Sequence, residues 1–123
     1  MSVVPVEPRP LSQLEAAVVA KLLALDFEGA AQFRTQIPFT QVVATWGADA
    51  PSVDLEVAPG SEQAGLIGGE LPVRGEVRDE RGSYIGEVTL WATDGFLSAI
   101  EYGWVTEDRP TSLPDPTLMT VST

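Results

Sequence analysis

The chain is predicted to fold as one α+β domain, with two N-terminal helices packed on one face of an antiparallel sheet of about five strands. Its 123 residues are the size of a single ordinary domain. A helical repeat of apolar residues begins after residues 1–10, and a shorter helical segment follows it. Residues 71–105 then hold three strand-like runs joined by two glycine-containing turns, which is typical of an antiparallel meander.

The first helix is predicted to begin at a capping box formed by Ser12 and Glu15. Apolar residues then recur at helical spacing, at Leu14, Val18, Leu22 and Leu25. A second helix is predicted from Asp26, acting as its N-cap, to about Gln36, because Pro38 disfavours any continuation.

The remaining elements follow from alternation and from turn residues. Strands are predicted at 39–46, 52–58, 71–79, 84–92 and 96–105. The glycine-rich segment 59–70 is predicted to be a mobile loop. The domain is expected to span residues 11–105, after an extended segment at 1–10. A proline-rich tail at 106–123 is expected to lie over the surface without regular structure.

The register of the meander decides which side chains share a face of the sheet. A four-residue loop at Asp79–Gly82 would place Arg74 opposite Glu87. The second turn, at 93–95, has either two residues, as an Asp-Gly turn, or three residues with a bulge at Gly95.

The two-residue turn separates one apolar set (Trp91, Phe96, Ile100, Tyr102 and Trp104) from the other (Val88, Leu90 and Ala92). The three-residue turn unites Val88, Leu90, Ala92, Phe96, Ile100, Tyr102 and Trp104 on one face, opposite Glu87, Thr89, Trp91, Leu97 and Glu101. We prefer the three-residue turn because it gathers most of the large apolar side chains on one face. Each of them contributes about 1.5–3 kcal/mol when it is buried.

Composition excludes several classes of site. The chain has no cysteine and no histidine, so metal sites built from these residues and catalysis by histidine or thiolate are excluded. A serine–lysine dyad would need Lys21, the only lysine, which is expected to reach solvent from the first helix. No cofactor and no metal is predicted.

Charge and hydropathy indicate which partners the chain can have. The net charge is −11, which disfavours nucleic acid and anionic membrane surfaces and favours a basic partner. The longest apolar run, at 16–25, is interrupted by Lys21 and is too short to span a bilayer. The N-terminus lacks the pattern of a signal peptide, so a cytoplasmic protein is expected.

Three groups of residues are candidates for a site. Glu87 and Glu101 are predicted to face each other beside Arg74, as an acid–base pair, as ligands of a hard cation, or simply as a solvated acidic face. An apolar patch of Ile85, Trp91, Leu97 and Val105 is predicted on the same face. This patch is either a surface for a partner or a second copy, or it is covered by the tail through Leu113, Leu118 and Met119.

The third group is aromatic. Trp46, Phe96, Tyr102 and Trp104 are predicted either to line a small-molecule pocket between a helix and the curved sheet or to fill the core there.

The chain from about residue 26 to residue 116 resembles a group of small uncharacterised actinobacterial proteins. The matching segments are DFEGAAQFRTQ (26–36), PSVDLEV (51–57), DGFLSAIEY (94–102) and PTSLPDP (110–116). Similar sequences often carry cysteines just before Pro51, where this chain has none. The resemblance implies no activity. The order of helices and meander is also similar to cystatin-like folds, as an analogy of topology alone.

These observations favour a non-enzymatic protein that binds another protein, for which the charge favours a basic one, or a second copy of itself. One version is an immunity-type or inhibitory protein that neutralises a basic effector. The alternatives are a module that binds a small molecule among the aromatic residues and an enzyme that uses Glu87 and Glu101, with or without Mg²⁺ or Ca²⁺.

Overall fold

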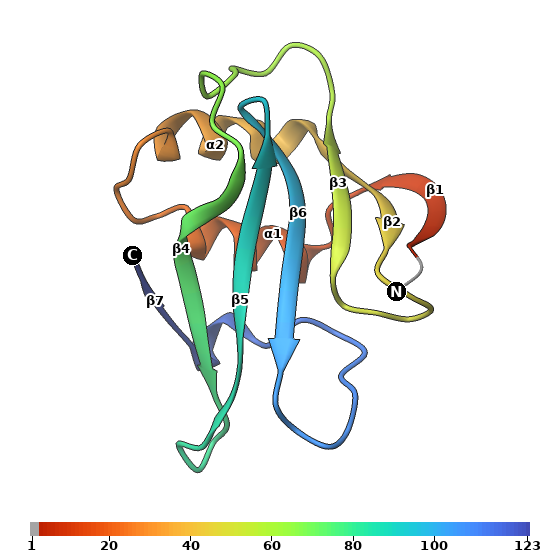
Figure 1. Ribbon diagram of the computed structural model, residues 1–123, viewed down its shortest axis with the longest axis vertical. Helices are drawn as coiled ribbons and strands as arrows, with labels where there is room; N and C mark the ends of the chain where they lie inside the picture. The colour runs from red at the N-terminus through yellow and green to blue at the C-terminus, as the bar shows by residue number, and fades with distance from the viewer. Residues whose placement is uncertain (1–2) are drawn as a thin grey trace.

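The computed structural model describes residues 3–123 and contains two α-helices and one antiparallel sheet of seven strands (Figure 1). The helices are α1 (Gln13–Leu22) and α2 (Ala30–Gln36), and two 3-10 helices lie at Ile37–Phe39 and Pro116–Leu118. The strands are β1 (Val4–Pro10), β2 (Thr40–Thr45), β3 (Val53–Val57), β4 (Gly69–Arg78), β5 (Tyr84–Thr93), β6 (Phe96–Trp104) and β7 (Met119–Ser122). Their order in the sheet is β1-β2-β3-β6-β5-β4-β7. The α+β class is confirmed, but the sheet has more strands than predicted, and the helices follow β1 rather than opening the fold.

Both helices lie on one face of the sheet, behind the strands in Figure 1. We call this the inner face and the opposite side the outer face. The core lies on the inner face, and its largest fully buried apolar side chains are Leu22, Leu23, Phe33, Leu90, Leu97 and Ile100. Burial at about 1.5–3 kcal/mol for each such side chain makes this layer the main source of stability.

The predicted capping box begins α1 as expected. The Ser12 hydroxyl accepts a hydrogen bond from the Glu15 backbone N–H, and the Glu15 carboxylate accepts one from the Ser12 N–H at 2.8 Å. The same carboxylate binds both terminal nitrogens of the Arg9 guanidinium, at 2.7 and 3.1 Å. Burial by itself raises the pKa of Glu15, but the bonds from Arg9 and Ser12 outweigh it and hold the pKa below its ordinary value.

Replacing Glu15 with glutamine should lower the free energy of unfolding by about 1 kcal/mol at neutral pH, because the amide keeps the cap but loses the ion pair. The folded-state pKa of Glu15 lies below the unfolded value of about 4.3. The difference between wild type and variant is therefore present above that pH and is lost as the pH falls through the folded-state pKa. Urea titrations across this range measure it. Glu28→Gln, an exposed site, is the control, and a difference that persists at the acid end would contradict the assignment.

The second helix is shorter than predicted. Asp26 does not cap it; its N-cap is Gly29, which has a left-handed φ of +88°. A Cβ at Gly29 would lie 2.6 Å from the Ile67 side chain, so both the backbone angle and the packing favour glycine there. Arg34 in α2 donates a hydrogen bond to the carbonyl oxygen of Leu23, which connects the two helices.

Residues 4–10 are extended, as predicted, but they form a strand of the sheet rather than a lead-in outside the domain, and residues 119–122 form another strand where an irregular tail was predicted. β1 pairs with β2 at one edge, where its three prolines are tolerated. β7 pairs with β4 at the other edge. Lys21 was predicted to reach solvent, but its ammonium donates to the carbonyl oxygens of Pro116 and Met119, at 2.5 and 2.9 Å. These charge-assisted bonds hold the tail on the inner side of the sheet.

The register of the first hairpin differs from the prediction. Five residues, 79–83, connect the paired residues Arg78 and Tyr84, and the Asp79 N–H donates to the Ser83 carbonyl oxygen. One extra residue of β5, Ile85, forms a bulge in the ladder. Arg74 consequently lies opposite Thr89 rather than Glu87.

The second turn has two residues, not the three that we preferred. Thr93 pairs with Phe96 around Asp94 and Gly95, which both have positive φ, and a bulge follows at Ser98. The bulge restores the predicted face for Ile100 and Tyr102. It also turns Leu97 inward, where 1% of it is exposed, and leaves Phe96 half-buried.

The loop predicted to be mobile packs against this turn. Ala64 N–H donates to the Gly95 carbonyl oxygen at 2.9 Å, and Gly95 N–H donates to that of Ile67 at 2.8 Å. The buried Gln36 amide donates to the carbonyl oxygens of Glu62 and Gly95, at 2.8 Å each. The loop, the turn and α2 therefore form one hydrogen-bonded junction at the end of the sheet shown at the top of Figure 1.

Candidate functional site

The outer face of the sheet lies on the side opposite the hydrophobic core. Within residues 3–123, neither helix lies on it, and the tail passes to the inner side (Figure 1). The strand pairings place six acidic side chains there against two arginines, Arg74 and Arg78; the acids are Asp54, Glu56, Glu70, Glu76, Glu87 and Glu101. The outer face thus carries a net negative charge.

The acids are not arranged as the sequence predicted. Glu87 lies opposite Glu76 on one side and opposite Gly103 on the other, while Glu101 lies opposite Thr89. Glu87 and Glu101 are diagonal neighbours rather than a facing pair. The predicted association of Arg74 with Glu87 does occur, diagonally, at 3.9 Å, between two partly exposed side chains.

Two tryptophans stand over the middle of the outer face, and each is fixed by a carboxylate. The Trp46 indole N–H donates to Asp54 at 2.8 Å, and the Trp91 indole N–H donates to Glu101 at 2.9 Å. Between the rings the sheet carries Ala99, which is too small to fill the space. The result is a depression of about 500 Å³, here called the indole hollow, lined by Val43, Trp46, Asp54, Leu55, Trp91, Thr93, Ser98 and Ala99.

The predicted apolar patch does not form around Trp91. Leu97 is buried in the core, and Ile85 lies at its bulge in a separate depression with Leu118. Val105 is 65% exposed just beyond the end of β6. The tail does not cover Trp91 either, because its buried residues, Leu113 and Met119, join the core.

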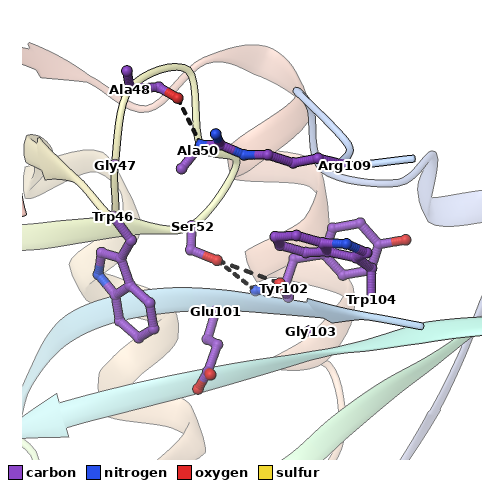
Figure 2. A pocket seen from close by; sticks show the side chains of 10 residues that line it. All are labelled: Trp46, Gly47, Ala48, Ala50, Ser52, Glu101, Tyr102, Gly103, Trp104 and Arg109. Carbon is purple, nitrogen blue, oxygen red and sulfur yellow. Dashed lines mark hydrogen bonds between the residues drawn. The ribbon is translucent and has the colours of Figure 1, made fainter. Parts of the chain in front are cut away.

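Three of the four predicted pocket residues do meet, in a different place. Trp46, Tyr102 and Trp104 line a depression of about 490 Å³ at the end of the sheet, here called the end groove. It lies between the 46–52 turn and the segment after β6, not between a helix and the sheet (Figure 2). Phe96 starts β6 at the opposite end and does not line it.

The walls of the end groove are held by local hydrogen bonds. Arg109 extends over the groove beside the Trp104 ring, and its guanidinium donates to the carbonyl oxygen of Ala48 at 2.6 Å (Figure 2). The buried Ser52 hydroxyl accepts from the Tyr102 backbone N–H at 2.9 Å. Burial, and secondarily the nearby Tyr84, raise the pKa of Tyr102 above its ordinary value, so its hydroxyl stays neutral.

Asp54, Ser52 and Arg109 are site residues that the sequence analysis did not single out. Alternation along 52–58 predicts an outward Asp54, but only the sheet order brings it close to Trp46 and Ala99. Arg109 belongs to the tail, and its place over Trp104 depends on where the chain leaves β6.

The arrangement gives little support to a metal-dependent reaction. No group of three or more histidine, cysteine, aspartate or glutamate side chains in the described part of the chain is placed to hold a metal ion.

None of the helices at residues 3–123 has the length and apolar character needed to cross a bilayer.

Comparison of the chain with protein-family models, with curated proteins and with solved structures found no match. The resemblance to actinobacterial proteins stays a prediction, and the likeness to cystatin-like folds stays an analogy.

Proposed function

We propose that the protein is a non-enzymatic binding module whose outer sheet face docks a basic protein partner. The observation that carries the proposal is the open outer face: its six acids and two partly exposed indoles have no covering element within residues 3–123. In a small protein, such a surface favours association with a partner of opposite charge.

The acidic character of the face determines the kind of partner. Ion pairs of the described chain join Arg74 to Glu87 and Arg78 to Glu76, and they leave the other acids of the face unpaired. A second copy of this chain would bring a further negative face, so a homodimer through this surface is disfavoured and a basic partner is favoured. An inhibitory or immunity-type role fits this chemistry, and the cytoplasmic location expected from the sequence is part of the proposal.

Reversing charge on the outer face should weaken capture of the partner about tenfold at low salt. Glu56→Lys with Glu70→Lys changes two exposed acids whose side chains make no hydrogen bond to any residue from 3 to 123. Glu28→Lys with Glu107→Lys changes the net charge equally at exposed positions off the outer face. Each variant and the wild type are immobilised, and the proteins captured from the source organism's lysate are quantified by mass spectrometry.

The proposal requires proteins that wild type and control retain and the outer-face variant loses. Equal capture by all three baits would contradict it. So would the absence of any stoichiometric partner together with a monomeric sedimentation profile.

A second candidate function is supported by the end groove. Its volume of about 490 Å³ falls within the range of small-molecule sites, and aromatic side chains with one arginine line it. A planar ligand could rest on Trp104 and meet the Arg109 guanidinium (Figure 2). We rank it second because the Arg109 guanidinium, the one cation in the lining of the groove, is already bonded to Ala48.

A further inference from the structure

We propose that the end groove receives an extended segment of the partner, whose main chain pairs with β6 at Trp104 and whose basic side chain lies over Gly103 toward Glu101. This inference rests on the proposed function and specifies one of its contacts. It is carried by three features: an opening in the sheet, the direction of the Trp104 backbone groups, and a glycine that the fold itself does not require.

The opening lies where β6 extends beyond its neighbour β3. Their ladder consists of two pairs, Val53 with Ile100 and Asp54 with Ala99. Before Val53 the chain stays with the 46–52 turn instead, where the Ser52 carbonyl oxygen accepts a hydrogen bond from the Trp46 N–H at 3.0 Å. The end groove occupies this opening, with the turn on one side and residues 101–104 of β6 on the other (Figure 2).

Alternation along β6 directs the backbone of Trp104 into the groove. The Tyr102 N–H donates to the Ser52 hydroxyl at 2.9 Å, on the β3 side. The Val105 N–H donates to the Ile85 carbonyl oxygen at 3.0 Å, on the β5 side. Successive residues of a strand point their N–H and C=O groups to opposite sides, so those of Trp104 point to the same side as those of Tyr102.

No strand within residues 3–123 pairs with Trp104 on that side, because the ladder with β3 ends at Ile100. This end of β6 is therefore a short sheet edge with an open donor and an open acceptor. Extended peptides bind such edges by adding a further strand.

Gly103 supports the approach of another chain at this point. Its φ is not positive, and a Cβ built there meets nothing within 4 Å, so neither the backbone nor the packing calls for glycine. Glycine weakens a strand, and it often marks a place where a ligand or another backbone approaches closely. Gly103 lines the end groove, so its missing side chain leaves room for a segment that pairs with Trp104.

The charges around the groove determine which side chains the segment carries. A residue opposite Gly103 points to the outer side of β6, where Glu101 is its diagonal neighbour and Glu87 lies across the glycine. Oε2 of Glu101 accepts no hydrogen bond from residues 3–123. A basic side chain therefore fits there. The next residue points to the other side, where Trp104 and Arg109 lie (Figure 2), so an uncharged side chain fits better.

The first test needs no ligand. The Trp104 amide should exchange with solvent at least about tenfold faster than the amides of Gly103 and Val105, which point to β5. Hydrogen exchange followed by NMR measures the three rates. Equal protection of the three amides would overturn the proposal, because the Trp104 N–H would then already have a partner.

The second test uses the blocked peptide Ac-Val-Arg-Val-Thr-NH₂, titrated to millimolar concentration into the ¹⁵N-labelled protein at low salt. It should shift the Trp104 amide resonance and slow its exchange, and it should leave the Gly95 amide, at the other end of the sheet, unchanged. Two further peptides carry N-methyl groups either on both valines or on the arginine and the threonine. A strand bound by one edge uses alternate amides, so only one of these two should lose affinity, by at least about tenfold. The peptide with glutamate in place of arginine should also bind at least about tenfold more weakly.

A matched pair of variants tests the role of the glycine. Gly103→Val should leave the midpoint of urea unfolding at or above that of wild type, since valine favours strands and meets no neighbour there. It should nevertheless weaken peptide binding at least about tenfold, because its side chain occupies the space above the edge. Thr120→Val, at an exposed position of β7, is the control and should change the affinity less than about twofold.

Four results would overturn the proposal: no peptide binding, an equal effect of the two N-methylated peptides, tighter binding of the glutamate peptide, or equal affinities of the Gly103→Val and Thr120→Val variants. Peptide binding and partner capture are separate measurements. Peptide binding at Trp104 without any captured protein would contradict the proposed function alone. Capture that is lost in the Glu56→Lys, Glu70→Lys variant and kept in Gly103→Val would contradict this inference alone.

Discussion

Replacing Gln36 with leucine should lower the free energy of unfolding by about 3 kcal/mol. Gln36 is fully buried at the end of α2, and its amide makes three hydrogen bonds to backbone groups. It donates to the carbonyl oxygens of Glu62 and Gly95 and accepts from the Leu97 N–H at 3.0 Å. Leucine has a similar volume but no polar atom, so these backbone groups lose a partner at a cost of about 1 kcal/mol or more each.

Gln32→Leu is the matched control, because it makes the same change on the same helix at a half-exposed position. Urea unfolding should separate the two variants clearly, with Gln32→Leu within about 0.5 kcal/mol of wild type. Hydrogen exchange should also show faster exchange of the Leu97 amide in Gln36→Leu. If the two variants were equally stable, the amide of Gln36 would not be what holds the junction together.

The parts of the fold that the sequence predicts well are those with a local physical signal. The capping box of Ser12 and Glu15 appears in the structure with both of its bonds. Alternation along 53–57 correctly separates inward valine and leucine from outward acids. These features depend on residues that are close in sequence, and their side chains fix the local backbone directly.

The turn and the bulges of the meander could not be predicted in this way. Apolar burial favoured one face for the β5 and β6 side chains, and that criterion was correct for Ile100 and Tyr102. The structure instead has a two-residue turn followed by the Ser98 bulge. This combination keeps Ile100 and Tyr102 on the predicted face, but it turns Leu97 inward in place of Phe96. Burial therefore selects the final face, whereas a bulge has no clear pattern in the sequence.

The candidate site illustrates the same limit. The sequence analysis named Trp46, Trp91 and Glu101 separately, in three different groups. The structure joins them, because β3 pairs with β6 and β6 with β5, placing strands that are distant in the chain next to each other. Asp54 enters the site through the same pairing. Non-local strand order, which the sequence left open, thus determines the chemistry of the outer face.

The second large effect is expected at Gly95. Replacing it with alanine should lower the free energy of unfolding by about 3 kcal/mol, from two causes. Gly95 has a φ of +81°, which costs an alanine about 1 kcal/mol. Its new Cβ would also overlap the carbonyl oxygen of Gly65 and come within 3.0 Å of the Ala64 backbone. The loop would have to move, which would weaken the bonds that Gly95 makes to it.

Gly82→Ala measures the first cause alone. Gly82 lies in the loop between β4 and β5 with a φ of +85°, and nothing lies within 4 Å of a Cβ built there. It should therefore show only the backbone cost of about 1 kcal/mol. The difference between the two variants measures how rigidly the 59–68 loop is held against the turn. Equal destabilisation would mean that the loop yields freely, as the glycine-rich sequence had suggested. A larger loss at Gly95 would show that its hydrogen bonds make it a fixed part of the fold, at the opposite end of the sheet from the end groove.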